Sequence, residues 1–201
     1  MPNRKYAVFL LALLTSAVMV GYYVYSKSVG HTPLALSSPP KGGDFTATSN
    51  QGPVSLSDFK GKWVYLYFGY TFCPDICPTN LGNLSAAYHQ LTPKEKNQVQ
   101  FLFFSVDPTR DTPKRLAEYS RYYDMNLIGM TSDKANIDHV TQQYGAVYAI
   151  HREAKDPDNY SVDHSAFTYV ISPQGKLVTQ LPHGTDAQAF LQNIRHNLKT
   201  Q

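Results

Sequence analysis

The chain has 201 residues, of which 42% are hydrophobic and 13% aromatic, which is enough for one well-buried domain and too few for two large ones. Its formal net charge is +3, and three basic residues near the N-terminus account for this excess: Arg4, Lys5 and Lys27. Because the rest of the chain is neutral, it lacks the basic surface that binding to nucleic acid requires, and we expect no nucleic-acid partner.

An apolar stretch without any charged residue occupies residues 6–25. As a helix, it is about as long as the hydrocarbon core of a bilayer is thick, roughly 30 Å. Two basic residues precede it and three tyrosines lie near its far end, so the positive-inside rule places residues 1–5 in the cytoplasm. We therefore predict a transmembrane anchor at residues 6–25 with the remaining chain outside the cytoplasm.

A cleaved signal peptide is the alternative interpretation of this stretch. Its apolar run exceeds the usual length of about 7 to 15 residues, and the nearest small-residue site, at residues 35–37, lies well downstream. The short N-terminus also lacks an Arg-rich, Ser-rich transit segment. The expected location is therefore a bacterial inner membrane, crossed once, with the C-terminal domain in the periplasm.

The next segment, residues 26–43, is rich in Ser, Pro and Gly and has no periodicity, which is typical of a flexible linker. Alternation around an Asn-Gln-Gly turn then predicts a β-hairpin within residues 45–56. Continuous apolar runs at residues 63–68 and 99–106 predict buried strands. Between them, residues 78–91 have helical spacing, so we expect a strand, helix and strand with a right-handed crossover.

The second half of the chain continues to alternate between helical and extended patterns. Helices are predicted at residues 111–123, 133–145 and 185–199, the second ending on Gly145 and the third beginning with Thr185 as its N-cap. Strands are predicted at residues 146–151 and 165–172, and a turn at 173–176 leads into residues 177–181. This order favours an α/β sandwich over residues 44–201, with a central mixed sheet flanked by helices.

The chain contains only two cysteines, Cys73 and Cys77, and each is followed by proline. At this spacing on a helical turn the two side chains share a face, with about 5–6 Å between their Cβ atoms. Pro78 places Cys77 near a helix N-terminus, whose positive end is expected to lower the pKa of both thiols, that of Cys77 more directly. A purely structural disulfide is disfavoured because so short a loop removes little entropy. The pattern leaves a redox pair and a metal-binding pair open.

Two sulfurs leave most metal sites incomplete, and seven histidines are candidates for a third ligand. Six of them lie in the linker, in amphipathic helices or near the ends of elements, where a solvated side chain is the simpler interpretation: His31, His89, His139, His151, His183 and His196. His164 differs because it directly precedes an apolar strand. Asp163 beside it is either an orienting partner of the imidazole or a solvated turn residue. We expect Asp107 to fix its loop and cap the next helix.

Three segments together resemble the Sco/SenC family: "YFGYTFCPDICPTN" at residues 67–80, "SVDPTRDTP" at 105–113 and "VDHSAFTYVISPQGK" at 162–176. The resemblance covers the chain from about residue 44 to its end and implies a thioredoxin-like fold with copper, Cu(I) or Cu(II), bound by Cys73, Cys77 and His164. It also implies delivery of copper to, or reduction of the cysteines of, the dinuclear centre in cytochrome c oxidase subunit two. The implied partners are that subunit or its assembly factors, other copper chaperones and thiol reductants.

The donor types agree with copper, because thiolates select Cu(I) and imidazole suits both oxidation states. Structural zinc normally has four protein ligands and is disfavoured. The alternative function is that of a thiol-disulfide oxidoreductase or a peroxidase on the same fold. The chain lacks the CxxC spacing and pre-strand proline of thioredoxins and the proline context of peroxiredoxin cysteines. A passive structural protein would leave these cysteines and histidine unexplained. We therefore assign no catalytic residue and leave enzymatic activity open, with Cys73 and Cys77 as a redox pair.

Overall fold

The computed structural model describes residues 15–23, 40–153 and 156–200. The chain divides into two units, Met1–Ser38 and Pro39–Gln201, and in the first unit residues 15–23 are helical. Residues 1–5, most of the predicted anchor and residues 26–39 of the predicted linker lie outside the described residues. Within the described ranges, no helix combines the length and the apolar character that crossing a membrane requires. The anchor at residues 6–25 stays a prediction.

A seven-stranded mixed sheet forms the centre of the second unit, with the strand order β2-β1-β5-β4-β3-β8-β9 among the described residues. Its strands are β1 (Thr46–Ser49), β2 (Gly52–Ser55), β3 (Trp63–Gly69), β4 (Val99–Ser105), β5 (Leu127–Thr131), β8 (Phe167–Ile171) and β9 (Leu177–Pro182). β3, β4 and β5 run parallel, whereas β1, β2, β8 and β9 join by antiparallel pairing. The predicted mixed sheet and N-terminal hairpin are confirmed.

β3 and β4 are buried along their entire length, as their continuous apolar sequences predict. Their alternating side chains divide the core between the two faces of the sheet. On one face Tyr67 stacks on Phe103, with 6.4 Å between ring centroids. On the other face the ring of Phe68 contacts Phe104 and Tyr169 at centroid distances of 5.6 and 5.3 Å. Aromatic residues therefore fill both layers of the sandwich.

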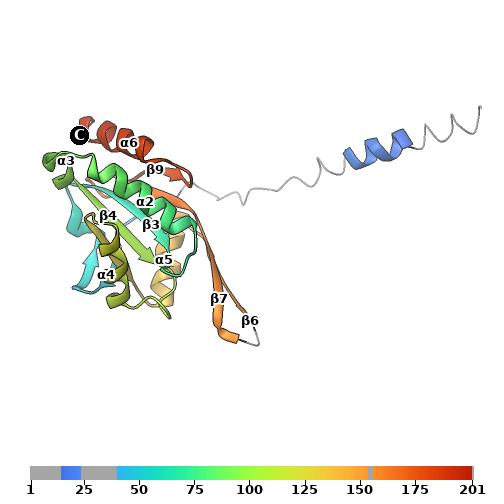
Figure 1. The fold of residues 1–201 in the computed structure, drawn as a ribbon, viewed down its shortest axis with the longest axis horizontal. Coiled ribbons are helices and arrows are strands. Elements are labelled where there is room, and N and C mark those ends of the chain that lie inside the picture. The colour runs from blue at the N-terminus through green and yellow to red at the C-terminus, as the bar shows by residue number, and fades with distance from the viewer. Residues whose placement is uncertain (1–14, 24–39, 154–155, 201) are drawn as a thin grey trace, which may run out of the picture. The chain divides into compact units, whose positions relative to one another are not determined.

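Helices cover both faces of the sheet (Figure 1). The Tyr67 face is covered by α2 (Ile76–His89), α4 (Pro113–Tyr122) and α6 (Ala187–Lys199), and the Phe68 face by α5 (Lys134–Tyr144). Two short helices, η1 (Leu56–Phe59) and α3 (Pro93–Asn97), lie at connections. α2 and α6 pack side by side. The long helix that follows β3 thus has its first turn at the carboxyl end of that strand.

A separate antiparallel hairpin consists of β6 (Tyr148–Glu153) and β7 (Asp156–His164) and extends away from the sheet (Figure 1). The sequence predicted β6 approximately but gave no sign of β7, whose first residues are polar residues with low strand propensity. β5 was also not predicted. Its Gly129 is required because a Cβ there would lie 2.8 Å from the Leu116 carbonyl oxygen of α4.

Two boundaries differ from the sequence prediction. The N-cap of α6 is Asp186, which accepts a hydrogen bond from the Ala189 amide at 2.8 Å, rather than Thr185, whose hydroxyl binds the Pro182 carbonyl. Residues at the end of the predicted linker contact the domain, because the Gly42 amide donates to the Gln143 carbonyl at 3.1 Å. The folded unit accordingly starts a few residues before residue 44.

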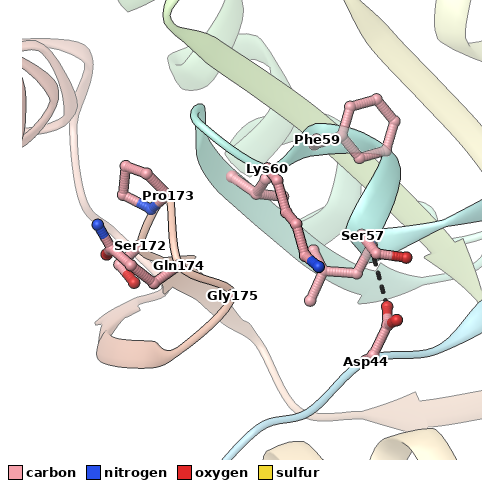
Figure 2. Close-up of a pocket in the computed structure, with 10 residues that line it drawn as sticks. Asp44, Ser57, Phe59, Lys60, Ser172, Pro173, Gln174 and Gly175 are labelled. Carbon is pink, nitrogen blue, oxygen red and sulfur yellow. Dashed lines mark hydrogen bonds between the residues drawn. The ribbon is translucent and has the colours of Figure 1, made fainter.

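A pocket lies between η1 and the turn that precedes β9 (Figure 2). Its wall includes Val64 at the start of β3, so it is at the opposite end of that strand from the two cysteines. The Asp44 carboxylate in this pocket accepts hydrogen bonds from the amides of Phe45 and Ser57, both at 3.0 Å. This carboxylate therefore serves to hold the local backbone.

Leu66 lies at the centre of β3 and is fully buried. Replacing Leu66 with Ala is expected to lower the free energy of unfolding by about 2–5 kcal/mol, because a cavity remains in the core on the Phe68 face of the sheet. Denaturant unfolding followed by the fluorescence of Trp63, the single tryptophan, measures this in the full chain held in a mild non-ionic detergent. Val178→Ala on exposed β9 serves as the control and should change stability by less than about 0.5 kcal/mol. Equal effects of the two substitutions would contradict the assignment of the core.

Candidate metal centre

Cys73, Cys77 and His164 meet at the carboxyl end of β3. Their two sulfur atoms and one imidazole nitrogen all lie within 4.8 Å of one another, and the Cys77 Sγ is 3.2 Å from the His164 Nε2. Within the described ranges no other Cys, His, Asp or Glu residues form such a group. The structure therefore brings together the three residues that the sequence predicted as one site.

The helix N-terminus acts on Cys73 rather than on Cys77. α2 begins at Ile76 with Asp75 as its N-cap, so Cys73 precedes the helix, and the Cys77 amide donates to the Cys73 Sγ at 3.5 Å. The pKa of Cys73 is lowered to about 3, mainly by a hydrogen bond from the Cys77 side chain, with further contributions from His164 and the Cys77 amide. Cys73 is thus a thiolate at neutral pH.

The expectation that the pKa of Cys77 is also lowered is wrong. Cys77 is 0% exposed, whereas Cys73 is 8% exposed, and burial raises the pKa of the Cys77 thiol. The hydrogen bond to Cys73 and the charge on that neighbour raise it further. In the metal-free site one proton therefore remains on Cys77. A metal that binds both sulfurs must displace this proton.

His164 is the last residue of β7, and its ring is held on several sides. Its Nδ1 lies 3.2 Å from the Ser165 carbonyl oxygen, so a proton on Nδ1 that bonds to this carbonyl would free the Nε2 lone pair for a metal. The rings of Tyr67 and Tyr70 meet the imidazole edge to face at 6.0 and 5.8 Å. The backbone and two aromatic rings therefore orient the imidazole.

Asp163 does not orient His164. Its carboxylate is exposed and lies 2.8 Å from the Nε2 of His151, across the β6–β7 hairpin. The hypothesis of an orienting role was wrong because the two neighbouring side chains of a strand point to opposite faces.

Gly69, the last residue of β3, is a site residue that the sequence analysis missed. A Cβ at this position would lie 2.6 Å from the Cys77 Sγ and 2.9 Å from the Phe103 ring. The strand backbone therefore approaches the sulfur closely enough to exclude any side chain. A glycine at the end of a buried strand, just before the cysteine loop, was the available signal.

Two buried carboxylates hold the loops of the site. Asp111 accepts hydrogen bonds from the Thr71 amide and hydroxyl and from the Ser105 hydroxyl at 2.8, 2.5 and 2.6 Å. Asp107 accepts from the Tyr160 hydroxyl at 2.6 Å. The first carboxylate fixes the cysteine loop to β4, and the second fixes β7.

The prediction for Asp107 is therefore correct for the loop and wrong for the helix cap. The N-cap of α4 is Thr112, whose hydroxyl accepts from the Arg115 amide at 3.3 Å. Asp107 is fully buried and is paired with the Nε of Arg110 at 2.5 Å. A buried carboxylate is stable only when it is paired in this way, so its position follows from the tertiary structure.

An open pocket gives access to two of the three candidate ligands, Cys73 and His164, and it is lined by Tyr70, Cys73, Pro74, Asp75, Ile76, Val162, Asp163 and His164. Two sulfurs and one imidazole suit copper, since sulfur binds Cu(I) and imidazole accepts both oxidation states. No fourth Cys, His, Asp or Glu among the described residues joins this group. The donor set therefore fits copper better than it fits a closed structural zinc site.

The close contact at Gly69 predicts that Gly69→Ala displaces the Cys77 sulfur. We expect a loss of about 1–3 kcal/mol in the free energy of unfolding from overpacking, together with alkylation of Cys77 by iodoacetamide, to which it is otherwise inaccessible. Gly82→Ala on the exposed face of α2, where a new Cβ meets nothing within 4 Å, is the matched control and should stabilise the helix by up to about 1 kcal/mol. Alkylation of Cys77 that stays undetectable in Gly69→Ala would contradict this packing.

The low pKa of Cys73 predicts a flat pH profile for its alkylation. Because the thiolate is fully formed well above pH 3, the rate with iodoacetamide should stay constant between about pH 5 and 8, where an ordinary thiol gains about tenfold per unit. In Cys77→Ala the main hydrogen-bond donor is absent, so the rate should fall as the pH is lowered. Mass spectrometry of quenched samples measures both profiles, and a steep profile in the unmodified chain would refute the assignment.

Comparison with known proteins places this site in a family context. The sequence profile of the SCO1/SenC family matches residues 35–199. The mitochondrial SCO2 protein of Saccharomyces cerevisiae is 37% identical over 166 residues, covering 82% of this chain and 55% of that protein. A SCO2-like protein of Rickettsia felis is 35% identical over 157 residues, covering 78% of this chain and 76% of its own length. The chain thus spans about half of the yeast relative.

Solved structures of similar proteins agree in fold. The copper-bound crystal structure of Arabidopsis thaliana ScoI superposes with a TM-score of 0.70 at 33% identity, covering 80% of this chain and 99% of that one. Copper-bound yeast Sco1 superposes with a TM-score of 0.73 at 30% identity, covering 81% of this chain and 91% of that one. The fold is the thioredoxin-like α/β fold expected from the sequence, and the chain belongs to the SCO1/SenC family.

Proposed function

We propose that this chain is a membrane-anchored copper-binding protein that assists assembly of the copper centre of cytochrome c oxidase. The observation that carries the proposal is the convergence of the Cys73, Cys77 and His164 ligand atoms within 4.8 Å of one another. The copper-bound structures of the Arabidopsis and yeast relatives support copper as the metal. The role in oxidase assembly, with subunit two or its assembly factors as partners, rests on membership of the family.

Three protein ligands suit a protein that passes copper on. The open pocket beside Cys73 and His164 leaves room for a ligand from a partner, so copper can move by stepwise exchange of ligands without passing through water. Cys73 offers a thiolate at once, whereas Cys77 must release its proton. The free energy of copper binding therefore includes the cost of deprotonating a buried thiol.

Loading depends on the reduced state of the pair. Both cysteines are free thiols in the structure, and a disulfide between them would remove both sulfur ligands. A reductant for this pair, or an upstream copper chaperone, is accordingly part of the proposal. The anchor at residues 6–25 would hold the domain at the periplasmic face of a bacterial inner membrane.

Thiol-disulfide exchange is the second candidate function, and the state of Cys73 favours it. A thiolate with some exposure beside a buried thiol is the arrangement of a nucleophilic and a resolving cysteine. In this role Cys73 would attack a disulfide in the partner, and Cys77 would then release the reduced partner. Reduction of the oxidase cysteines and delivery of copper would thus use the same two sulfurs.

Copper titration of the full chain in mild detergent tests the copper proposal. The reduced chain should bind one copper ion per molecule with thiolate-to-Cu(II) charge-transfer absorption, and the oxidised chain should bind none. His164→Ala should weaken binding by at least about tenfold, the loss typical of a disturbed ligand shell, and should change the spectrum.

His151→Ala is the matched control, because His151 lies on the same hairpin and pairs with Asp163 outside the ligand group. It should leave both the affinity and the spectrum unchanged. If His164→Ala behaves like His151→Ala, the third ligand is assigned wrongly. If the reduced chain binds no copper but rapidly reduces a protein disulfide, the exchange function is the correct one.

A further inference from the structure

An exposed aromatic ring stands at the edge of the site. Phe72 directly precedes Cys73 and is 49% exposed, although most large apolar residues of the domain are buried. Two guanidinium groups hold its ring: the Cζ atoms of Arg115 and Arg110 lie 4.2 and 4.7 Å from the ring centroid. Such cation–π contacts keep the ring in one place at the surface.

The two arginines differ in the hydrogen-bond donors that remain available to a partner. Arg110 is largely covered, stacks on Tyr160 at 3.6 Å, and uses its Nη1 to donate to the Tyr160 carbonyl at 2.9 Å. Arg115 is 45% exposed, and its Nε lies 3.8 Å from the buried Asp111 carboxylate and donates to the Thr71 hydroxyl at 2.6 Å. Among the described residues, the two Nη nitrogens of Arg115 have no hydrogen-bond partner. Arg115 thus presents a fixed pair of donors to solvent beside Phe72.

Other exposed apolar side chains border the same site. Val147 and Phe167 are 70% and 39% exposed, and they flank the turn after His164, where the Ser165 amide donates to the Val147 carbonyl at 2.9 Å. The exposed carboxylates of Asp75 and Asp163 line the pocket. The positive charge at this end therefore lies with the arginines beside Phe72.

We propose that Phe72 and Arg115 form a docking edge that receives a protein segment bearing carboxylates next to its own cysteine. The exposed guanidinium fork matches a carboxylate, which it can bind through two hydrogen bonds. The ring of Phe72 offers an apolar contact for the adjoining side chain. A cysteine beside that carboxylate in the bound segment then lies next to Cys73, because Cys73 directly follows Phe72 in the chain. The inference rests on the proposed function, because it requires a partner protein whose cysteine exchanges with a sulfur of this site.

Disulfide exchange tests the docking edge without copper. The probes are three peptides of equal length whose single cysteine carries an aryl disulfide and is flanked by Glu, Gln or Lys. The Cys73 thiolate attacks the peptide sulfur, a new S–S bond forms, and the peptide–aryl S–S bond breaks. The aryl thiolate leaves with the electron pair of the broken bond, so Cys73 is oxidised and the aryl sulfur is reduced. Absorbance of the released aryl thiolate gives the rate.

With the reduced full chain in non-ionic detergent, the Glu peptide should react about tenfold faster than the Lys peptide at low salt, which is at the lower end of electrostatic acceleration of association. Rates are divided by those of the same peptides with 2-mercaptoethanol, an uncharged thiol, which removes intrinsic differences in reactivity. At about 1 M salt, where the screening length falls to about 3 Å, the preference should largely disappear. Equal normalised rates for all three peptides would overturn the proposal.

Arg115→Gln should lower the normalised rate for the Glu peptide to that for the Gln peptide. Phe72→Ala, which removes the ring that holds the guanidinium, should reduce the preference as well. Arg121→Gln is the matched control, since it removes the same charge further along α4 and should leave the preference intact. If Arg115→Gln slows all three peptides equally, Arg115 only supports the loop through Thr71, and the proposal is wrong. If Arg121→Gln loses as much of the preference for the Glu peptide, the preference comes from net charge alone and the proposal is wrong.

Copper titration of the unmodified chain separates this proposal from copper binding. A chain that binds copper without any peptide preference refutes the docking edge and leaves the proposed function standing. A chain that prefers the Glu peptide but binds no copper refutes copper binding and supports the docking edge.

Discussion

The close approach of the β3 backbone to the first turn of α2 is the constraint on which the site depends. Gly69 allows the Cys77 sulfur to lie against the strand, where a Cβ would be 2.6 Å from that sulfur. This contact buries Cys77 completely, whereas Cys73 keeps 8% exposure and faces the amide of Cys77. One sulfur is therefore a stabilised anion and the other a protonated thiol, although the two residues are chemically identical.

The third candidate ligand, His164, is positioned by contacts that are distant in the sequence. Asp107 follows β4, and its carboxylate binds Tyr160 of β7 at 2.6 Å, four residues before His164. Asp111 holds Thr71 and thereby the loop that carries Cys73. Each of these carboxylates is buried but bound by several donors, which is the condition for tolerating a charge in the interior. The carboxyl end of β4 is thus the common support of the cysteine loop and the histidine strand.

The sequence predicted the elements with strong periodicity and failed where tertiary contacts decide. The apolar runs of β3 and β4 and the helical spacing of α2 could be identified, and the three candidate ligands followed from the cysteine spacing and the family motifs. The order of the two thiol pKa values could not, because it depends on the burial of Cys77 against Gly69. The pairing of Asp163 with His151 depends on β7, whose polar sequence has little strand propensity.

The asymmetry of the two thiols determines the side from which a partner can approach. Cys77 lies against the β3 backbone at Gly69 and is closed to solvent, whereas Cys73 lines the open pocket. In the proposed function, an incoming sulfur therefore reaches Cys73 first, whether the event is transfer of copper or attack on a disulfide. Cys77 and His164 then hold the metal, or complete the exchange, from the protected side. Copper transfer and disulfide exchange both begin at Cys73, because the structure leaves only this one of the two sulfurs accessible.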